Sequence, residues 1–169
     1  ETVSAIGISE PGAGADPQLM KTTAVQDGDD WVINGRKIWI TKADEADFTI
    51  LMAVTDKQPN GRNGMSAFLV DRDTPGFNVL RKIPMIDGTA TYEIALDDCR
   101  VPEWKLLGKR GQGFLPMQIR LGTRRIEMAS WSIGMAQRAL DMMIEYAPQR
   151  VTFGKPLSSR QTVQNWVSD

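Results

Sequence analysis

The stretch WVINGRKIWIT, residues 31–41, decides the fold class of this chain. It holds two runs of alternating or β-branched residues, at 31–35 and 37–41, and Asn34-Gly35 ends the first of them. An Asn-Gly pair between such runs is a strong hairpin signal, because both central residues of the tight turn need a positive φ. We therefore expect two antiparallel strands joined at Asn34-Gly35.

Similar runs recur on both sides of this stretch, up to about residue 108. Turn residues such as Asp27-Gly28-Asp29 and Thr74-Pro75-Gly76 separate them at a nearly regular spacing. Regular short strands with turn residues between them favour an antiparallel barrel or sandwich. The further strands that we expect lie at 48–54, 65–70, 76–80 and 91–96.

The hydrophobic period changes from about Gln112. Apolar residues now recur near helical spacing, with Arg and Glu between them; they are Met128, Trp131, Met135, Leu140, Met143 and Ala147. This pattern predicts a long helix to about Tyr146, a turn around 151–156 and a second helix from Ser158.

The sequence thus predicts an α+β chain in two parts. We expect an antiparallel β-barrel domain over 1–110, followed over 111–169 by the first helix and the start of the second helix of a helical bundle. The boundary falls in LLGKRGQGF, residues 106–114.

Composition narrows the function classes. Lys plus Arg number 20 and Asp plus Glu 21, so the chain shows no basic excess for nucleic acid. No stretch approaches the roughly 20 apolar residues of a membrane span. The single cysteine, Cys99, excludes an internal disulfide and fits a reducing compartment. That compartment would be cytoplasmic in a bacterium, and mitochondrial or peroxisomal in a eukaryote.

The residue types permit cofactor binding more readily than histidine-based catalysis. The chain has no histidine, which excludes Ser-His and Cys-His catalysis, and we expect no metal site. GISEPGAGAD, residues 7–16, lacks the Lys and Ser/Thr of a P-loop and does not open a helix in a βαβ unit. Ser9, Thr41 and Trp39 offer two hydroxyls and a large ring, which suit a planar heterocycle. Trp39 as an ordinary core residue remains the alternative.

Seven motifs occur in an order that resembles the acyl-CoA dehydrogenase family. They are SEPGAGAD, INGRKIWIT, DTPGF, CRVPEWKLLG, GQGF, IGMAQRALD and QRVTFGKPLSSRQTVQ. The resemblance covers almost the whole chain. It implies the middle β-barrel of that family and the beginning of its C-terminal four-helix bundle, that is, a fragment of a larger chain.

The same resemblance implies a cofactor, a reaction and partners. Family members bind FAD, take a proton from Cα and a hydride from Cβ of an acyl-CoA, and pass electrons to an electron-transfer flavoprotein. The implied FAD contacts within the chain are Ile6, Ile8, Ser9, Ala15, Trp39, Ile40 and Thr41. The implied contacts to the FAD of a neighbouring subunit are Arg150, Thr152, Phe153 and Gln161, so a homodimer or homotetramer is expected.

The implied substrate contacts depart from the family pattern in several places. They are Ala15, Thr89, Gly122, Arg124 and Arg125. The family often has Ser at Ala15 and an acidic residue at Gly122, and these departures put ordinary straight-chain specificity in doubt.

The catalytic base is not assigned by the sequence. In some branches of the family a Glu stands at the position of Arg124, and an arginine cannot abstract a proton near neutral pH. Glu127 is a candidate substitute. In other branches the carboxylate lies near the end of the C-terminal domain, so we expect the base to be absent from these residues and the chain alone to be inactive.

Two alternatives stay open. The same fold also serves flavin monooxygenases and nitroalkane oxidases. A non-catalytic relative could use the barrel as a docking surface in an assembly or binding protein.

Overall fold

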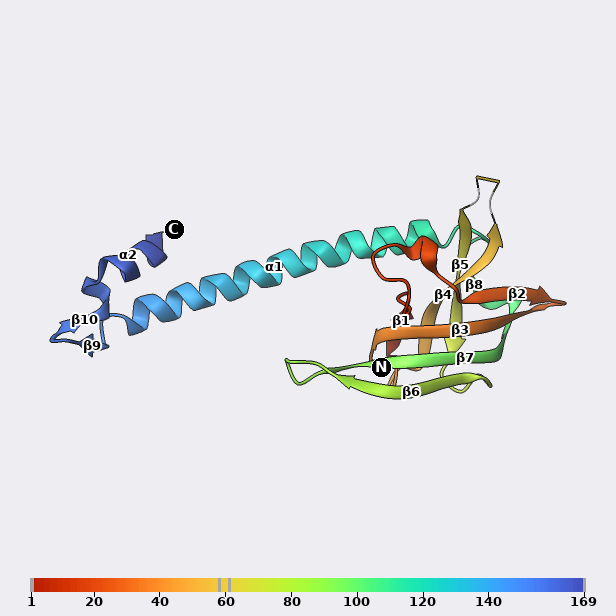
Figure 1. The fold of residues 1–169 in the computed structure, drawn as a ribbon, viewed down its shortest axis with the longest axis horizontal. Helices are drawn as coiled ribbons and strands as arrows, with labels where there is room; N and C mark the ends of the chain where they lie inside the picture. Colours follow the sequence, from red (N-terminus) through yellow and green to blue (C-terminus); the bar gives the residue numbers. More distant parts are fainter. Residues whose placement is uncertain (1, 58, 61, 169) are drawn as a thin grey trace. The chain divides into compact units, whose positions relative to one another are not determined.

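The computed structural model describes residues 2–57, 59–60 and 62–168 (Figure 1). The chain divides into a sheet unit, Glu1–Met117, and a helical unit, Gln118–Asp169. The predicted α+β class, with strands first and helices after them, is confirmed.

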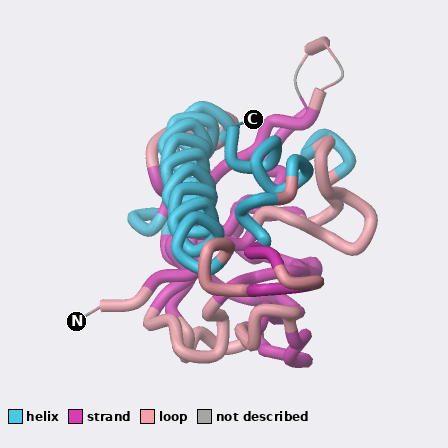
Figure 2. The backbone as a smooth tube through the Cα atoms, turned by 90° about the vertical axis from the view of Figure 1, so that its left-hand side faces the viewer, coloured by secondary structure: helices cyan, strands magenta, loops and turns pink. Residues whose placement is uncertain are grey.

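Eight strands of the described chain form one sheet, in the order β6-β7-β3-β2-β4-β5-β8, with β1 paired to β4 off this path (Figure 1). Most neighbours are antiparallel as expected, but β1 and β2 each pair with β4 in parallel. The strands, drawn in magenta in Figure 2, are β1 Ser4–Gly7, β2 Thr23–Asp27, β3 Asp30–Thr41, β4 Phe48–Lys57, β5 Asn63–Asp71, β6 Phe77–Pro84, β7 Ala90–Pro102 and β8 Leu106–Leu107.

The core lies on the inner face of this sheet. Along β3, β5 and β7 most inward residues are apolar and almost fully buried, among them Trp31, Ile33, Phe68, Val70 and Ile94. The rings of Trp31 and Phe68 lie 5.4 Å apart and are tilted, an arrangement that aromatic pairs favour. This core fixes the direction in which the remaining side chains of β3 point.

The predicted hairpin at Asn34-Gly35 is wrong, because β3 runs unbroken from Asp30 to Thr41. The pairing of β3 with β7 instead shifts between Ile33 and Gly35. The Asn34 amide group donates to the Asp98 carboxylate at 3.0 Å and accepts the Asp98 N–H at 2.9 Å. Asn-Gly thus marks a β-bulge that is held by a residue far along the chain.

Gly35 is needed at that bulge for two reasons. Its φ is +155°, and a Cβ there would come within 2.3 Å of Thr22 Oγ1 and 2.7 Å of Thr22 Cα. The actual turn between β2 and β3 is the predicted one at Asp27-Gly28-Asp29, where Asp27 pairs with Asp30 and Gly28 has a φ of 63°.

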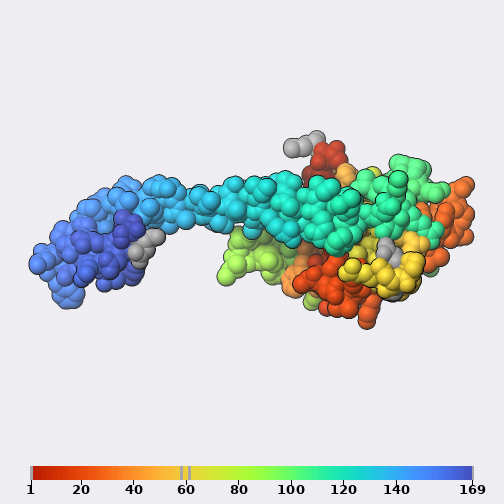
Figure 3. Space-filling model, turned by 90° about the horizontal axis from the view of Figure 1, so that it is seen from above, coloured from red at the N-terminus to blue at the C-terminus, as the bar shows by residue number. Residues whose placement is uncertain are grey.

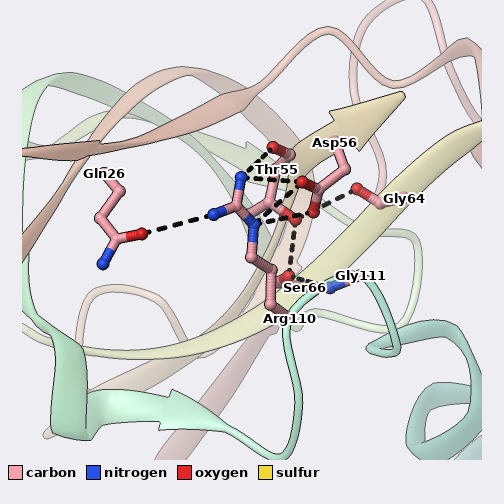
Figure 4. A network of polar contacts seen from close by, with 7 residues as sticks. All are labelled: Gln26, Thr55, Asp56, Gly64, Ser66, Arg110 and Gly111. Atoms are coloured by element: carbon pink, nitrogen blue, oxygen red, sulfur yellow. Dashed lines mark hydrogen bonds and ion pairs between the residues drawn. The ribbon is translucent and has the colours of Figure 1, made fainter. Parts of the chain in front are cut away.

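A polar network fastens the segment before the long helix to the sheet (Figure 4). The Arg110 guanidinium donates to both Asp56 carboxylate oxygens, at 2.9 and 3.1 Å, and lies over the Trp31 ring. These hydrogen bonds hold the pKa of Asp56 below its usual value. The Ser66 hydroxyl accepts the Gly111 N–H at 2.8 Å. The segment before the helix is therefore part of the sheet unit.

The long helix α1 spans Phe114–Tyr146, so its predicted end is confirmed. A two-stranded hairpin of β9 Val151–Thr152 and β10 Lys155–Pro156 follows, then a 3₁₀ turn and α2, Gln161–Ser168. Hydrogen bonds from Leu157 N–H to the Arg150 carbonyl and from Ser158 N–H to the Ala147 carbonyl tie these elements to the end of α1. Figure 3 shows them gathered there in blue.

Candidate functional site

The glycine-rich stretch forms a tight loop directly after β1. Glu10 and Ala13 exchange both backbone hydrogen bonds, at 2.8 and 3.1 Å, which closes the turn around Pro11 and Gly12. The Ser9 carbonyl accepts the Ile38 N–H at 2.9 Å, so the loop lies beside β3. The Ser9 side chain is half-buried at this junction.

A buried ion pair lies under the loop. The Lys37 ammonium group lies 2.8 Å from the Glu10 carboxylate, and both side chains are almost fully buried. Burial lowers the pKa of Lys37 to about 8, although Glu10 opposes this shift. Burial alone raises the pKa of Glu10, but hydrogen bonds from Lys37, Thr22 and Lys21 outweigh it and leave the pKa below its ordinary value.

Trp39 is not a core residue, so the alternative that the sequence left open does not hold. The pairing of β3 with β7 shifts again between Lys37 and Ile40, and Trp39 has a φ of 65°. The Trp39 side chain is 55% exposed, while its neighbour Ile40 is 2% exposed. A bulky residue at positive φ is uncommon and persists where the surrounding structure holds it. This bulge therefore presents the indole ring at the surface.

Thr41 and Thr89, which the resemblance assigns to cofactor and substrate, line one open groove of about 590 Å³. Thr41 pairs across β3 and β7 with Thr91. The hydroxyl of Thr89 donates to the Asp87 carboxylate at 2.7 Å, and this bond lowers the pKa of Asp87. The groove is lined by Thr41, Lys42, Asp44, Lys82, Thr89 and Tyr92, among others.

The other residues of the sheet unit that the resemblance assigns to the FAD site differ in their exposure to solvent and in their hydrogen bonding. Ile6 lies in β1 opposite Ile50 and is half-buried. The Ile8 carbonyl already accepts a hydrogen bond from Lys37 Nζ at 3.2 Å. Ala15 is exposed just before the 3₁₀ turn that Asp16 caps.

The predicted residues of the helical unit fall into two groups. Gly122, Arg124, Arg125 and Glu127 lie on α1. Arg124 donates to the Glu127 carboxylate at 2.6 Å, and its guanidinium lies 4.4 Å from the centroid of the Trp131 ring. The carboxylate proposed as a substitute base is therefore already ion-paired.

The second group surrounds the β9–β10 hairpin. Phe153 stands at its tip with a φ of 51°, ahead of Gly154 at 72°, and its side chain is fully exposed. The Thr152 carbonyl accepts a hydrogen bond from the Arg160 guanidinium at 2.7 Å. Arg150 and Gln161 lie exposed on either side of the hairpin.

Sequence reasoning missed the buried ion pair between Lys37 and Glu10. A lysine in an alternating strand is normally read as solvent-exposed. No pattern within β3 indicated its burial, which depends on the pairing of β3 with β7 and on the loop after β1.

Two classes of site are not found among the described residues. No group of three or more His, Cys, Asp or Glu side chains could hold a metal ion in residues 2–57, 59–60 and 62–168. Over that same part of the chain, no helix has the length and apolarity to cross a bilayer.

The fold defines a class: an α+β protein whose glycine-rich loop lies beside a strand that carries an exposed indole, Trp39. Two family models match the chain, the acyl-CoA dehydrogenase middle domain over residues 5–99 and the acyl-CoA dehydrogenase C-terminal domain over 111–169. The chain belongs to the acyl-CoA dehydrogenase family, and the resemblance read from the motifs is confirmed.

Individual relatives resemble the chain along its whole length. It is 46% identical to (R)-benzylsuccinyl-CoA dehydrogenase of Thauera aromatica, over 100% of this chain and 42% of that protein. Butyryl-CoA dehydrogenase of Megasphaera elsdenii superposes with a TM-score of 0.91 at 36% identity, over 99% of this chain and 44% of that one. A glutaryl-CoA dehydrogenase of Mycobacterium smegmatis in complex with FADH2 superposes with a TM-score of 0.87 at 33% identity, over 99% of this chain and 42% of that one. The chain thus spans less than half the length of these relatives.

Proposed function

We propose that this chain is part of an FAD-dependent acyl-CoA dehydrogenase, which removes one hydrogen from Cα and one from Cβ of an acyl-CoA thioester. The observation that carries the proposal is Trp39, whose exposed ring is held at a β-bulge next to the glycine-rich loop. An exposed indole suits stacking against the flat isoalloxazine ring of a flavin. Membership of the family and the relative in complex with FADH2 support this assignment.

The residues around Trp39 fit the polar edge of such a ring. The hydroxyls of Ser9 and Thr41 would donate to it, and backbone groups at Ile6, Ile8, Ala15 and Ile40 would complete the contacts. Arg150, Thr152, Phe153 and Gln161 would bind the FAD of a second copy of the chain, where Arg150 would supply a fixed fork of donors to the pyrophosphate. The active protein is then a homodimer or homotetramer that passes its electrons to an electron-transfer flavoprotein.

The chemistry that FAD supplies when bound is acceptance of the hydride that leaves Cβ, while a base takes the proton from Cα and a carbon–carbon double bond forms. Of the residues that the resemblance assigns to the substrate, Thr89, Gly122 and Arg125 would contact the acyl-CoA. Arg124 cannot serve as the base because its guanidinium stays protonated, and it holds the Glu127 carboxylate in an ion pair. We therefore propose that the base lies outside these 169 residues and that they are inactive alone.

Anaerobic titration of the full-length protein tests the proposal. Acyl-CoA thioesters, among them butyryl-CoA, glutaryl-CoA and benzylsuccinyl-CoA, are added while the visible flavin absorbance is followed. We expect at least one thioester to bleach the flavin, and an electron-transfer flavoprotein to restore its absorbance. Bleaching by a nitroalkane alone would indicate the oxidase alternative, and a colourless protein would contradict the proposal.

A further inference from the structure

Lys37 is a fully buried lysine that the proposed reaction does not use. It lies on β3, and its side chain is 0% exposed. Its ammonium group donates to the Ile8 carbonyl at 3.2 Å and to the Glu10 carboxylate at 2.8 Å. Taking a charged group out of water costs several kcal/mol unless hydrogen bonds and an opposite charge compensate, so these contacts determine how the lysine can be accommodated.

Glu10 extends this contact to a third segment of the chain. One of its carboxylate oxygens accepts the Lys21 N–H at 2.7 Å, and the other accepts the Thr22 N–H at 3.0 Å as well as Lys37. Thr22 in turn packs against Gly35 of β3. The carboxylate therefore joins the glycine-rich loop to β3 and to the segment before β2.

The four successive residues 7–10 lie along Lys37 and its neighbour Ile38. A Cβ on Gly7 would lie 3.5 Å from Lys37 Cγ, so the lysine stem packs closely against β1. Ile8 and Glu10 accept from the ammonium group, and the Ser9 carbonyl accepts the Ile38 N–H at 2.9 Å. Trp39 follows Ile38 directly, at the bulge. The loop is thus joined to the strand that carries the indole both by the Ser9–Ile38 backbone bond and by the Lys37 ammonium group.

We propose that Lys37 and Glu10 are positioning residues of the cofactor site, and that their buried ion pair holds the Ser9 hydroxyl and the Trp39 ring in register for the flavin. This inference rests on the proposed function. Apolar side chains of similar volume often replace a buried ion pair without loss of stability. Such apolar side chains cannot form hydrogen bonds with the Ile8 carbonyl or with the Lys21 and Thr22 N–H groups. The ion pair therefore supplies a geometry that packing alone does not.

The test compares Lys37→Met and Glu10→Gln in the full-length protein. The control is Lys105→Met, which removes the Lys105–Asp71 ion pair elsewhere in the sheet unit. FAD affinity, the shape of the visible flavin bands and the melting temperature are measured for each variant. We expect Lys37→Met to weaken FAD binding roughly tenfold or more and to shift the flavin bands, because small misplacements in a site have large effects. Lys105→Met leaves the affinity and the bands unchanged.

Each outcome separates this inference from the proposed function. If the wild type binds FAD and a folded Lys37→Met protein has the same affinity and spectrum, the positioning role is overturned while the function stands. If the wild type binds no flavin, both fail. If Lys37→Met does not fold, Glu10→Gln decides, because it keeps the size of the side chain: a shifted flavin spectrum supports the role and an unchanged one overturns it.

Discussion

The sheet unit and the helical unit bury their apolar residues to very different degrees. Trp31, Ile33 and Phe68 of the sheet unit are at most 1% exposed, whereas Ile126 and Ile133 of α1 are each 71% exposed. A helix whose apolar residues are exposed normally buries them against partner helices. The comparison indicates that the sheet unit is specified by its own core, whereas these apolar residues of α1 are not buried within the helical unit.

Core truncation is expected to give the largest difference between the units. Phe68→Ala removes a ring that contacts Trp31 and should lower the free energy of unfolding by about 3–5 kcal/mol. Ile133→Ala in α1 should change it by no more than about 0.5 kcal/mol. Urea unfolding of both variants of the chain measures this. Equal losses would show that α1 is already packed.

Two glycines provide the next comparison. Gly35→Ala would drive a Cβ into Thr22 at a φ of +155°, so we expect a loss of about 3 kcal/mol. Gly134→Ala in α1 meets no atom within 4 Å and should gain about 0.5–1 kcal/mol through helix propensity. Thermal unfolding, monitored by circular dichroism, measures the change in stability of both variants. A destabilising Gly134→Ala would contradict the open environment of Gly134.

The buried Lys37 of the sheet unit predicts that the free energy of unfolding depends on pH. The pKa of Lys37 is about 8 in the folded chain, against an ordinary value of 10.5. Between these values the unfolded chain binds more protons, so this group makes the free energy of unfolding rise as the pH rises. Urea unfolding of the wild type and Lys37→Met from pH 7.5 to 10 should show the rise only in the wild type. A parallel dependence in both would remove Lys37 as its cause.

A surface ion pair of the helical unit should have the smallest effect. Glu127→Gln breaks the contact with Arg124, and both side chains are more than two-fifths exposed. We expect a loss of about 0.3–0.5 kcal/mol, which 0.5 M salt should largely abolish. A loss above about 2 kcal/mol in urea unfolding would mean that this pair is buried against another element.

The sequence predicted those features that local pattern determines. The strands near 48–54, 65–70 and 91–96 and the end of the helix at Tyr146 follow from hydrophobic period and turn residues. The hairpin at Asn34-Gly35 was wrong because a contact between Asn34 and Asp98, 64 residues away, converts the pair into a bulge. The exposure of Trp39 and the burial of Lys37 depend on the pairing of β3 with β7 and on the loop after β1, and single-strand patterns do not carry that information.

The most direct test of the cofactor surface is an FAD titration of the full-length protein, comparing Trp39→Ala with Trp104→Ala. Trp104 is also exposed, at 77%, but stands in the 3₁₀ turn Glu103–Lys105, where its ring centroid lies 5.1 Å from Lys105 Nζ. If Trp39 stacks on the flavin, Trp39→Ala should weaken FAD binding by about 1–3 kcal/mol, the range for ring stacking on an aromatic side chain, while Trp104→Ala binds as the wild type does. Equal affinities in all three proteins would contradict the account.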